Sequence, residues 1–179
     1  MGRTACAPTN ICGYCLKKAV KYGKYLYYNP LLMDTYDRRC QLGASRRRLE
    51  DALALHNQKR WTGAIYLGGY AIECSLKSLI CYEHKEDNLK DTKIFQKGLQ
   101  AASLHNLTNL LNSLPGVQRT IKLDRTGTYK QAWKVVSSLW HNDELRYSDK
   151  TGDEKSSEKF IQAIQILHRF LLDKQGEAS

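Results

Sequence analysis

Residues 61–82 read WTGAIYLGGYAIECSLKSLICY and form the longest mostly apolar stretch of the chain. Its apolar residues recur at helical spacing, which predicts a helix over about residues 59–83. Glu73 and Lys77 interrupt the stretch near its middle, where a bilayer-spanning helix tolerates charge poorly. We therefore expect a buried helix of a folded domain and no transmembrane segment. The main apolar stripe of this helix comprises Ile65, Ile72, Leu76 and Leu79.

Helical periodicity extends over most of the chain after residue 36, and no segment alternates as a strand would. The pattern predicts an all-α, up-and-down bundle of four to five helices with short to moderate connections. Residues 85–102 are polar and are expected to form a connection with a short helix. The other expected helices cover about residues 36–56, a segment capped by Ser103 that stops at Pro115–Gly116, residues 128–140, and a last segment after residues 151–153.

Charge is distributed unevenly along the 179 residues, which carry a formal net charge of +10. Residues 1–48 hold 10 Lys/Arg and 2 Asp/Glu, whereas residues 49–179 hold 18 and 16. We therefore divide the chain into a basic extension that contains Tyr and Cys, residues 1–33, and a helical domain, residues 34–179.

Three interpretations of the extension stay open. It is a disordered, solvated tail. Alternatively it is an arm in which tyrosines stack on single-stranded bases while lysines meet phosphates. In the third interpretation it is non-native sequence translated from upstream of Met33, the only methionine after Met1.

Cysteine spacing gives a weak metal signal. Cys12 and Cys15 are separated by two residues, and Cys6 and Cys40 would be needed to complete a four-thiolate zinc site. Structural zinc sites usually have a second such pair, which is missing here, so we predict no metal and no cofactor. The N-terminus has no continuous apolar run of the kind found in secretory signals, so the expected location is cytoplasmic.

A polar stripe flanks the apolar one on the helix of residues 59–83. Tyr66, Tyr70, Glu73 and Lys77 fall at i, i+4, i+7 and i+11, which places them on one helix face. One interpretation is a weak ion pair between Glu73 and Lys77 on a solvent-exposed face. The other is a buried pair that fixes the position of an arginine from another helix and needs further hydrogen bonds of its own.

Three motifs resemble a known family. They are Gly69-Tyr70-Ala71-Ile72-Glu73-Cys74-Ser75-Leu76-Lys77, Leu104-His105-Asn106-Leu107-Thr108-Asn109-Leu110-Leu111, and Trp140 through Arg146-Tyr147. Their order resembles the HEPN superfamily (higher eukaryotes and prokaryotes nucleotide-binding domains), in particular its small bacterial members, over about residues 36–174. The resemblance implies a bundle of four to five helices, nucleotide or RNA binding, a homodimer, and a role in a toxin–antitoxin or defence-type system, with a nucleotidyltransferase as a partner.

Many HEPN proteins are RNases in which an Arg is followed after four to six residues by a His. No His follows Arg146 at that spacing, and Arg119 and Arg125 also fail the test. Cleavage of RNA through its 2′-hydroxyl needs a proton acceptor and a group that stabilises charge on the phosphate, tasks suited to His and Arg. His105 or His141 are the candidates for the missing histidine.

Two functional hypotheses follow. The first is a HEPN-type binding or interaction module in which Lys77, Arg146 and Tyr147 bind phosphate. The second is a divergent metal-independent RNase that uses Arg146 with His105 or His141. Tyr70, Glu73 and Trp140 are predicted to form a polar cluster beside these residues. In a purely structural alternative, the Arg146 guanidinium pairs with Glu73 and stacks on Tyr147 or Trp140.

Overall fold

A computed structural model describes residues 34–177 of the chain, and within this range it is helical, without a strand. The all-α prediction is confirmed for these residues. The residues from Asp34 onward form one compact unit, and the predicted extension, residues 1–33, lies outside the described residues. The elements are α2 (Arg38–Asn57), α3 (Trp61–His84), η1 (Leu89–Asp91), α4 (Lys93–Gln96), η2 (Ala101–His105), α5 (Leu107–Asn112), α6 (Pro115–Lys122), α7 (Thr128–Leu139), α8 (Asn142–Arg146) and α9 (Glu154–Asp173).

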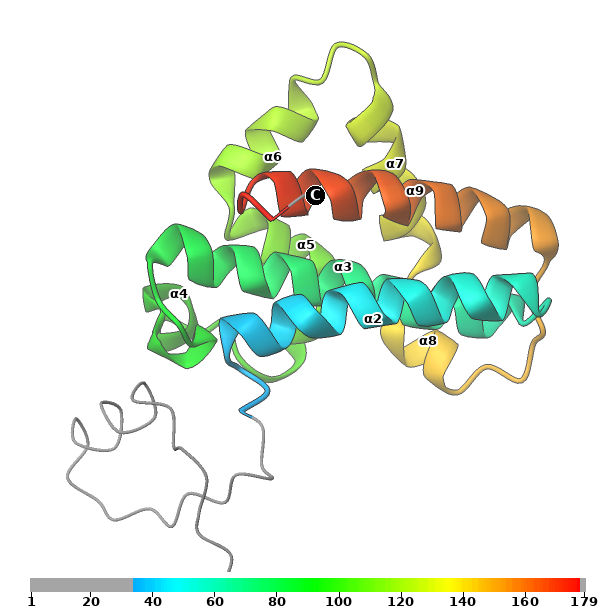
Figure 1. The fold of residues 1–179 in the computed structure, drawn as a ribbon, viewed down its shortest axis with the longest axis horizontal. Helices are drawn as coiled ribbons and strands as arrows, with labels where there is room; N and C mark the ends of the chain where they lie inside the picture. Colours follow the sequence, from blue (N-terminus) through cyan, green and yellow to red (C-terminus); the bar gives the residue numbers. More distant parts are fainter. Residues whose placement is uncertain (1–33, 178–179) are drawn as a thin grey trace, which may run out of the picture. The chain divides into compact units, whose positions relative to one another are not determined.

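The first two long helices, α2 and α3, form an antiparallel pair, as the periodicity predicts (Figure 1). The Asp37 carboxylate caps α2 by accepting hydrogen bonds from the backbone N–H groups of Arg39 and Cys40, which would otherwise lack intrahelical partners. Helix α3 carries most of the core, and its side chains at Ile72, Leu76, Leu79 and Ile80 are fully buried. Burial of such side chains is the main contribution to the stability of the unit.

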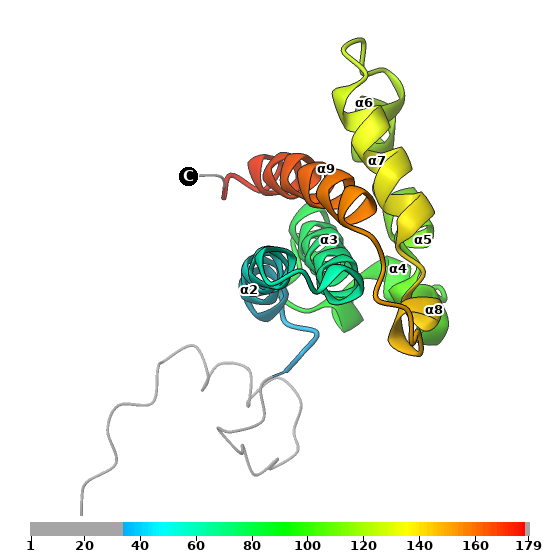
Figure 2. The same cartoon turned by 90° about the vertical axis from the view of Figure 1, so that its right-hand side faces the viewer.

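Two adjacent glycines of α3 set how closely other elements approach it. A Cβ at Gly68 would lie 2.6 Å from Ile164 of α9, so glycine allows α9 to pack tightly against α3. A Cβ at Gly69 would lie 1.9 Å from Nε1 of Trp140, so glycine also allows the Trp140 indole to lie against the α3 backbone. Figure 2 shows α2, α3 and α9 nearly end-on, with α6 and α7 to one side of them.

The connection after α3 contains the expected short helix, α4, between two 3-10 turns, η1 and η2. Thr92 caps α4 by accepting a hydrogen bond from the backbone N–H of Phe95. The connection is held to the start of the chain's folded part, because Asn88 pairs with Asp37 in an isolated bridge and donates a side-chain hydrogen bond to Asp34.

Two details of the next segment differ from the sequence-based expectation. Asn106, not Ser103, caps α5, because its side-chain oxygen accepts the backbone N–H of Asn109 at 3.0 Å. Pro115 begins a further helix, α6, rather than ending the helical segment. Proline is well tolerated at this first position, where its missing N–H would have no intrahelical partner.

Helices α6 and α7 form a hairpin that extends beyond α9 (Figure 1). Gly127 permits the turn between them, since its φ of 76° lies in the left-handed region. Helix α7 packs on α9 through the stacked rings of Tyr129 and Phe170. Helix α9 starts at the Asp153 cap, as the Thr151-Gly152-Asp153 break predicts. In the described part of the chain, no helix is long and apolar enough to cross a lipid bilayer.

Candidate functional site

The polar stripe of α3 is buried rather than exposed at Glu73 and Lys77. Only 2% of Glu73 and 7% of Lys77 is exposed, and the Lys77 ammonium donates to a Glu73 carboxylate oxygen at 2.6 Å. The interpretation of this pair as a weak surface ion pair is therefore wrong. A buried carboxylate needs further hydrogen-bond partners, because removal from water is costly for a charge.

The further partner of Glu73 is a histidine, not the expected arginine. Nδ1 of His105 lies 3.1 Å from one Glu73 oxygen and 3.3 Å from the other. His105 ends η2 between two buried residues, Leu104 and Leu107, which anchor the backbone on both sides of it. About half of the His105 side chain is exposed, so one edge of the ring meets the buried carboxylate while the ring still reaches solvent. With Nδ1 engaged, Nε2 is the ring nitrogen left for a ligand.

Arg146, at the end of α8, is held by tyrosines. Its Nε donates to the Tyr66 hydroxyl at 3.4 Å, and its terminal nitrogen donates to the Tyr70 hydroxyl at 3.3 Å. These contacts and one with Tyr147 raise the pKa of Arg146, so the guanidinium is permanently charged. Arg146 does not pair with Glu73 as the structural alternative proposed, because its guanidinium donates to the two tyrosine hydroxyls instead.

The two tyrosines form a short network on α3. The hydrogen bond between Tyr66 and Tyr70, supported by the Arg146 guanidinium, lowers the pKa of Tyr66, whereas burial raises the pKa of Tyr70. The Tyr70 hydroxyl donates to the side-chain oxygen of Asn142 at 2.7 Å. The network therefore ties the first residue of α8 and its last, Arg146, to the same face of α3.

Trp140 supports this network from the side. Its Nε1 donates to the backbone oxygen of Tyr66 at 3.0 Å, and its ring meets that of Tyr70 edge-on at a centroid separation of 5.4 Å. Trp140 is 5% exposed, so it is largely a packing residue that sets where α8 begins. The predicted polar cluster of Tyr70, Glu73 and Trp140 is therefore two separate groups. Glu73 contacts Lys77 and His105, whereas Tyr70 contacts Trp140 and Asn142.

A cleft of about 580 Å³ brings together the three residues predicted as catalytic. Arg146 and His141 line it from α8 and its N-cap, and His105 lines it from the end of η2. The volume lies within the roughly 300–1,000 Å³ typical of small-molecule sites. The remaining lining side chains include Asn106, Thr108, Ser137, Trp140, Asn142, Asp143 and Glu144.

Two predicted phosphate ligands lie elsewhere. Lys77 does not line the cleft, and its ammonium is buried against Glu73. Tyr147 is 80% exposed and does not line the cleft either, although it contacts Arg146. Sequence reasoning missed Tyr66 as a ligand of Arg146, although its i, i+4 spacing from Tyr70 was the signal. It also missed Asp143 and Glu144, which no spacing rule singled out.

The sequence predicts no metal. Of the four cysteines considered for a zinc site, Cys6, Cys12 and Cys15 lie outside the described residues. Residues 34–177 contain no group of three or more His, Cys, Asp or Glu side chains suited to hold a metal ion. Cys40 is a half-buried free thiol.

Comparison with known proteins gives no match for this chain among protein-family models, curated proteins or solved structures.

Proposed function

We propose that the cleft binds a nucleotide or an RNA strand through its phosphate, as in a HEPN-like binding module. The observation that carries the proposal is the convergence on one cleft of His105 and Arg146, which are 41 positions apart in sequence. A guanidinium with a fixed position offers parallel N–H donors to phosphate oxygens. The tyrosine network supplies that fixed position.

The mixed charge of the cleft favours a nucleotide over inorganic phosphate. Asp143 and Glu144 line the same cleft as Arg146, and carboxylates accept hydrogen bonds from ribose hydroxyls and base amino groups. A ligand with a phosphate at one end and a sugar and base at the other satisfies both kinds of side chain.

The wider biological setting rests on the resemblance of the three motifs to the HEPN superfamily. We propose a homodimer that works in a toxin–antitoxin or defence-type system, with a nucleotidyltransferase as a candidate partner. The antiparallel α2–α3 pair and the packing of α9 on α3 are compatible with the helical bundle that the resemblance implies.

A second candidate function is metal-independent RNA cleavage, and the hydrogen bond between Glu73 and His105 favours it. A carboxylate at Nδ1 orients an imidazole, so that Nε2 is placed to take the proton of a 2′-hydroxyl. Arg146 would stabilise the charge that develops on the phosphate. His141 lines the cleft as well and is the alternative proton carrier.

Incubation of purified protein with a labelled RNA pool, in EDTA and in magnesium, tests both candidates when binding and cleavage are measured together. Binding that Arg146→Ala weakens supports the module, and cleavage in EDTA that His105→Ala abolishes supports the RNase. The matched controls are Arg169→Ala on the exposed face of α9 and His84→Ala at the end of α3. Binding that Arg146→Ala and Arg169→Ala leave equally strong would contradict the proposal.

A further inference from the structure

A second concave surface lies on the hairpin of α6 and α7, separate from the residues that hold Arg146. It is a groove of about 610 Å³, and lysines from both helices line it. Lys122 contributes from the end of α6, and Lys130 and Lys134 contribute from α7, one helical turn apart. Gln131 and Trp133 complete its α7 side, so an aromatic ring lies among the cations. We call this surface the hairpin groove.

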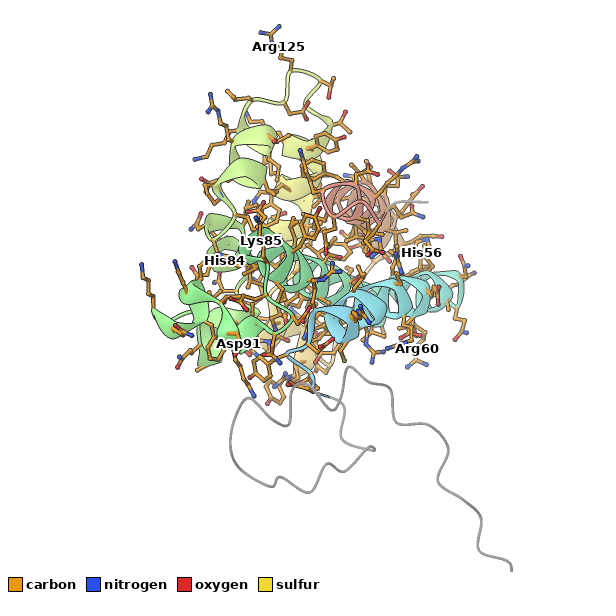
Figure 3. The ribbon with its side chains drawn as sticks, turned by 60° about the vertical axis from the view of Figure 1, so that its left-hand side comes forward. His56, Arg60, His84, Lys85, Asp91 and Arg125 are labelled. Atoms are coloured by element: carbon orange, nitrogen blue, oxygen red, sulfur yellow. The ribbon has the colours of Figure 1, made fainter. Side chains whose placement is uncertain are left out.

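The hairpin carries a concentrated positive charge. Residues 115–139 hold five Lys/Arg and one acidic residue, a net charge of +4 within 25 residues. Arg125 extends from the tip of the hairpin, away from the other helices (Figure 3). The single acid, Asp124, is engaged at the start of α7, where its carboxylate accepts the backbone N–H of Tyr129 and the hydroxyl of Thr126. Asp124 thus caps α7.

The groove lysines are not neutralised by acidic side chains of the described residues. Among residues 34–177, no ion pair involves Lys122, Lys130 or Lys134. In α2, by contrast, Arg46 pairs with Glu177 and Arg48 pairs with Asp51. All three groove lysines are exposed, so their ammonium groups are available to a partner with several negative charges.

The hairpin groove and the cleft meet on α7. Ser137 lines both of them, one turn after Lys134 on the same helix. A chain that lies along the groove therefore reaches the wall of the cleft without leaving the surface of α7. A compact ligand would occupy only one of the two sites, whereas a strand with repeated negative charges can occupy both.

The geometry points to the hairpin groove as a binding site for the backbone of single-stranded RNA, which it guides to the cleft. Lys122, Lys130 and Lys134 contact successive phosphates, and Trp133 provides an aromatic face for a base. The identity of the strand as RNA rests on the proposed function of the cleft. The groove itself is assigned by its unpaired cations, its tryptophan and its continuity with the cleft.

The test compares two pairs of lysines with the same spacing in the full chain. Lys130→Gln/Lys134→Gln removes two groove cations, and Lys155→Gln/Lys159→Gln removes two exposed cations of α9. Binding of a labelled oligouridylate of about 12 nucleotides, a length within the range of single-strand-binding sites, is measured by fluorescence anisotropy across salt concentrations. All variants keep residues 1–33, so this basic segment contributes equally to each.

We expect the groove variant to bind the oligonucleotide at least tenfold more weakly at low salt than the α9 variant. Its plot of log affinity against log salt should be shallower by about 1.4, because each phosphate contact on a single strand contributes about 0.7. Equal affinities and equal slopes for the two variants would overturn the inference. So would equally tight binding of polyglutamate, which would indicate an acidic protein as the partner.

A uridine dinucleotide separates this inference from the proposed function, because it can fill the cleft but not the groove as well. If Arg146→Ala weakens dinucleotide binding while the two lysine variants bind the oligonucleotide equally, the cleft proposal stands and the groove inference fails. If the dinucleotide does not bind but oligonucleotide binding still depends on Lys130 and Lys134, the groove inference stands and the cleft proposal fails.

Discussion

Nδ1 of His105 lies 3.1 Å from the carboxylate of Glu73, although the two residues are 32 positions apart. The same carboxylate accepts a hydrogen bond from Lys77. Glu73 therefore links a buried ion pair of α3 to a ring that lines the cleft, and a change at this residue affects both the stability of the unit and the orientation of His105.

Replacement of Glu73 by Gln should be strongly destabilising, because it leaves the buried Lys77 ammonium without its counter-charge. We expect a loss of about 3–5 kcal/mol in the free energy of unfolding, as for other buried pairs with one partner removed. Denaturant titration followed by circular dichroism measures this loss.

The double variant Glu73→Gln/Lys77→Met removes both charges and should recover most of the lost stability, since an uncharged buried position has no unpaired ion. On the RNase hypothesis, the double variant should not restore RNA cleavage, because His105 still lacks its carboxylate partner. A double variant as unstable as Glu73→Gln would argue against this explanation.

Replacement of Tyr66 by Phe should weaken phosphate binding at the cleft. The change keeps the ring but removes the hydroxyl that binds both Arg146 and Tyr70, so we expect a loss of about 1 kcal/mol in binding free energy, or roughly fivefold in affinity. The control is Tyr82→Phe at the far end of α3, which should leave affinity unchanged. Titration with a uridine dinucleotide measures both, and an unchanged affinity in Tyr66→Phe would count against the role of the tyrosine network.

Gly69→Ala should destabilise the protein, because the added methyl group would occupy the position of the Trp140 indole. Overpacking and the loss of the Trp140 hydrogen bond to Tyr66 together predict about 2–4 kcal/mol. Gly116→Ala in α6 is the matched control. A Cβ added at Gly116 would meet nothing within 4 Å, and alanine is the better helix former, so stability should stay equal or rise by up to about 1 kcal/mol. Thermal unfolding of the two variants measures the contrast, and similar melting temperatures would refute it.

Stability should fall in acid through His168. Burial, with a smaller effect of Arg46, lowers the pKa of His168 from 6.5 to about 4 in the folded state. Between about pH 6.5 and pH 4, His168 is therefore protonated in the unfolded chain but not in the folded protein. The free energy of unfolding decreases as the pH falls through this range. The loss at pH 4 should be up to roughly 3 kcal/mol.

His168→Gln tests this pH dependence, because glutamine keeps a polar group beside Ser45 but does not titrate in this range. Unfolding free energies at a series of pH values should show a flatter curve for His168→Gln than for the parent. A parent curve with no decline below pH 6.5 would contradict the assignment.

Local patterns determined much of the fold. The helical periodicity predicted α2, α3, α7 and α9 within a few residues of their observed bounds, because an amphipathic helix shows its buried face in the spacing of its apolar residues. The prediction that the helical segment stops at Pro115 was wrong, and it too was based on local sequence alone. Proline ends one helix and begins the next equally well, and sequence alone does not say which.

The candidate site could be predicted only as a set of residues. The motifs singled out Glu73, His105, His141 and Arg146, but not that Glu73 contacts His105 or that tyrosines hold Arg146. These pairings join residues from η2, α3 and α8, and their distances depend on how the helices pack rather than on spacing along any one of them.

The spacing of apolar residues thus predicted helices after residue 36, and the sequence shows which residue types are available for chemistry. Packing between helices, which the sequence does not reveal, buries Lys77 against Glu73 and brings His105 and Arg146 into one cleft. It also places Ser137 between that cleft and the hairpin groove. The physical reason is that helix formation depends on neighbours within one or two turns, whereas burial and charge pairing depend on contacts between distant segments.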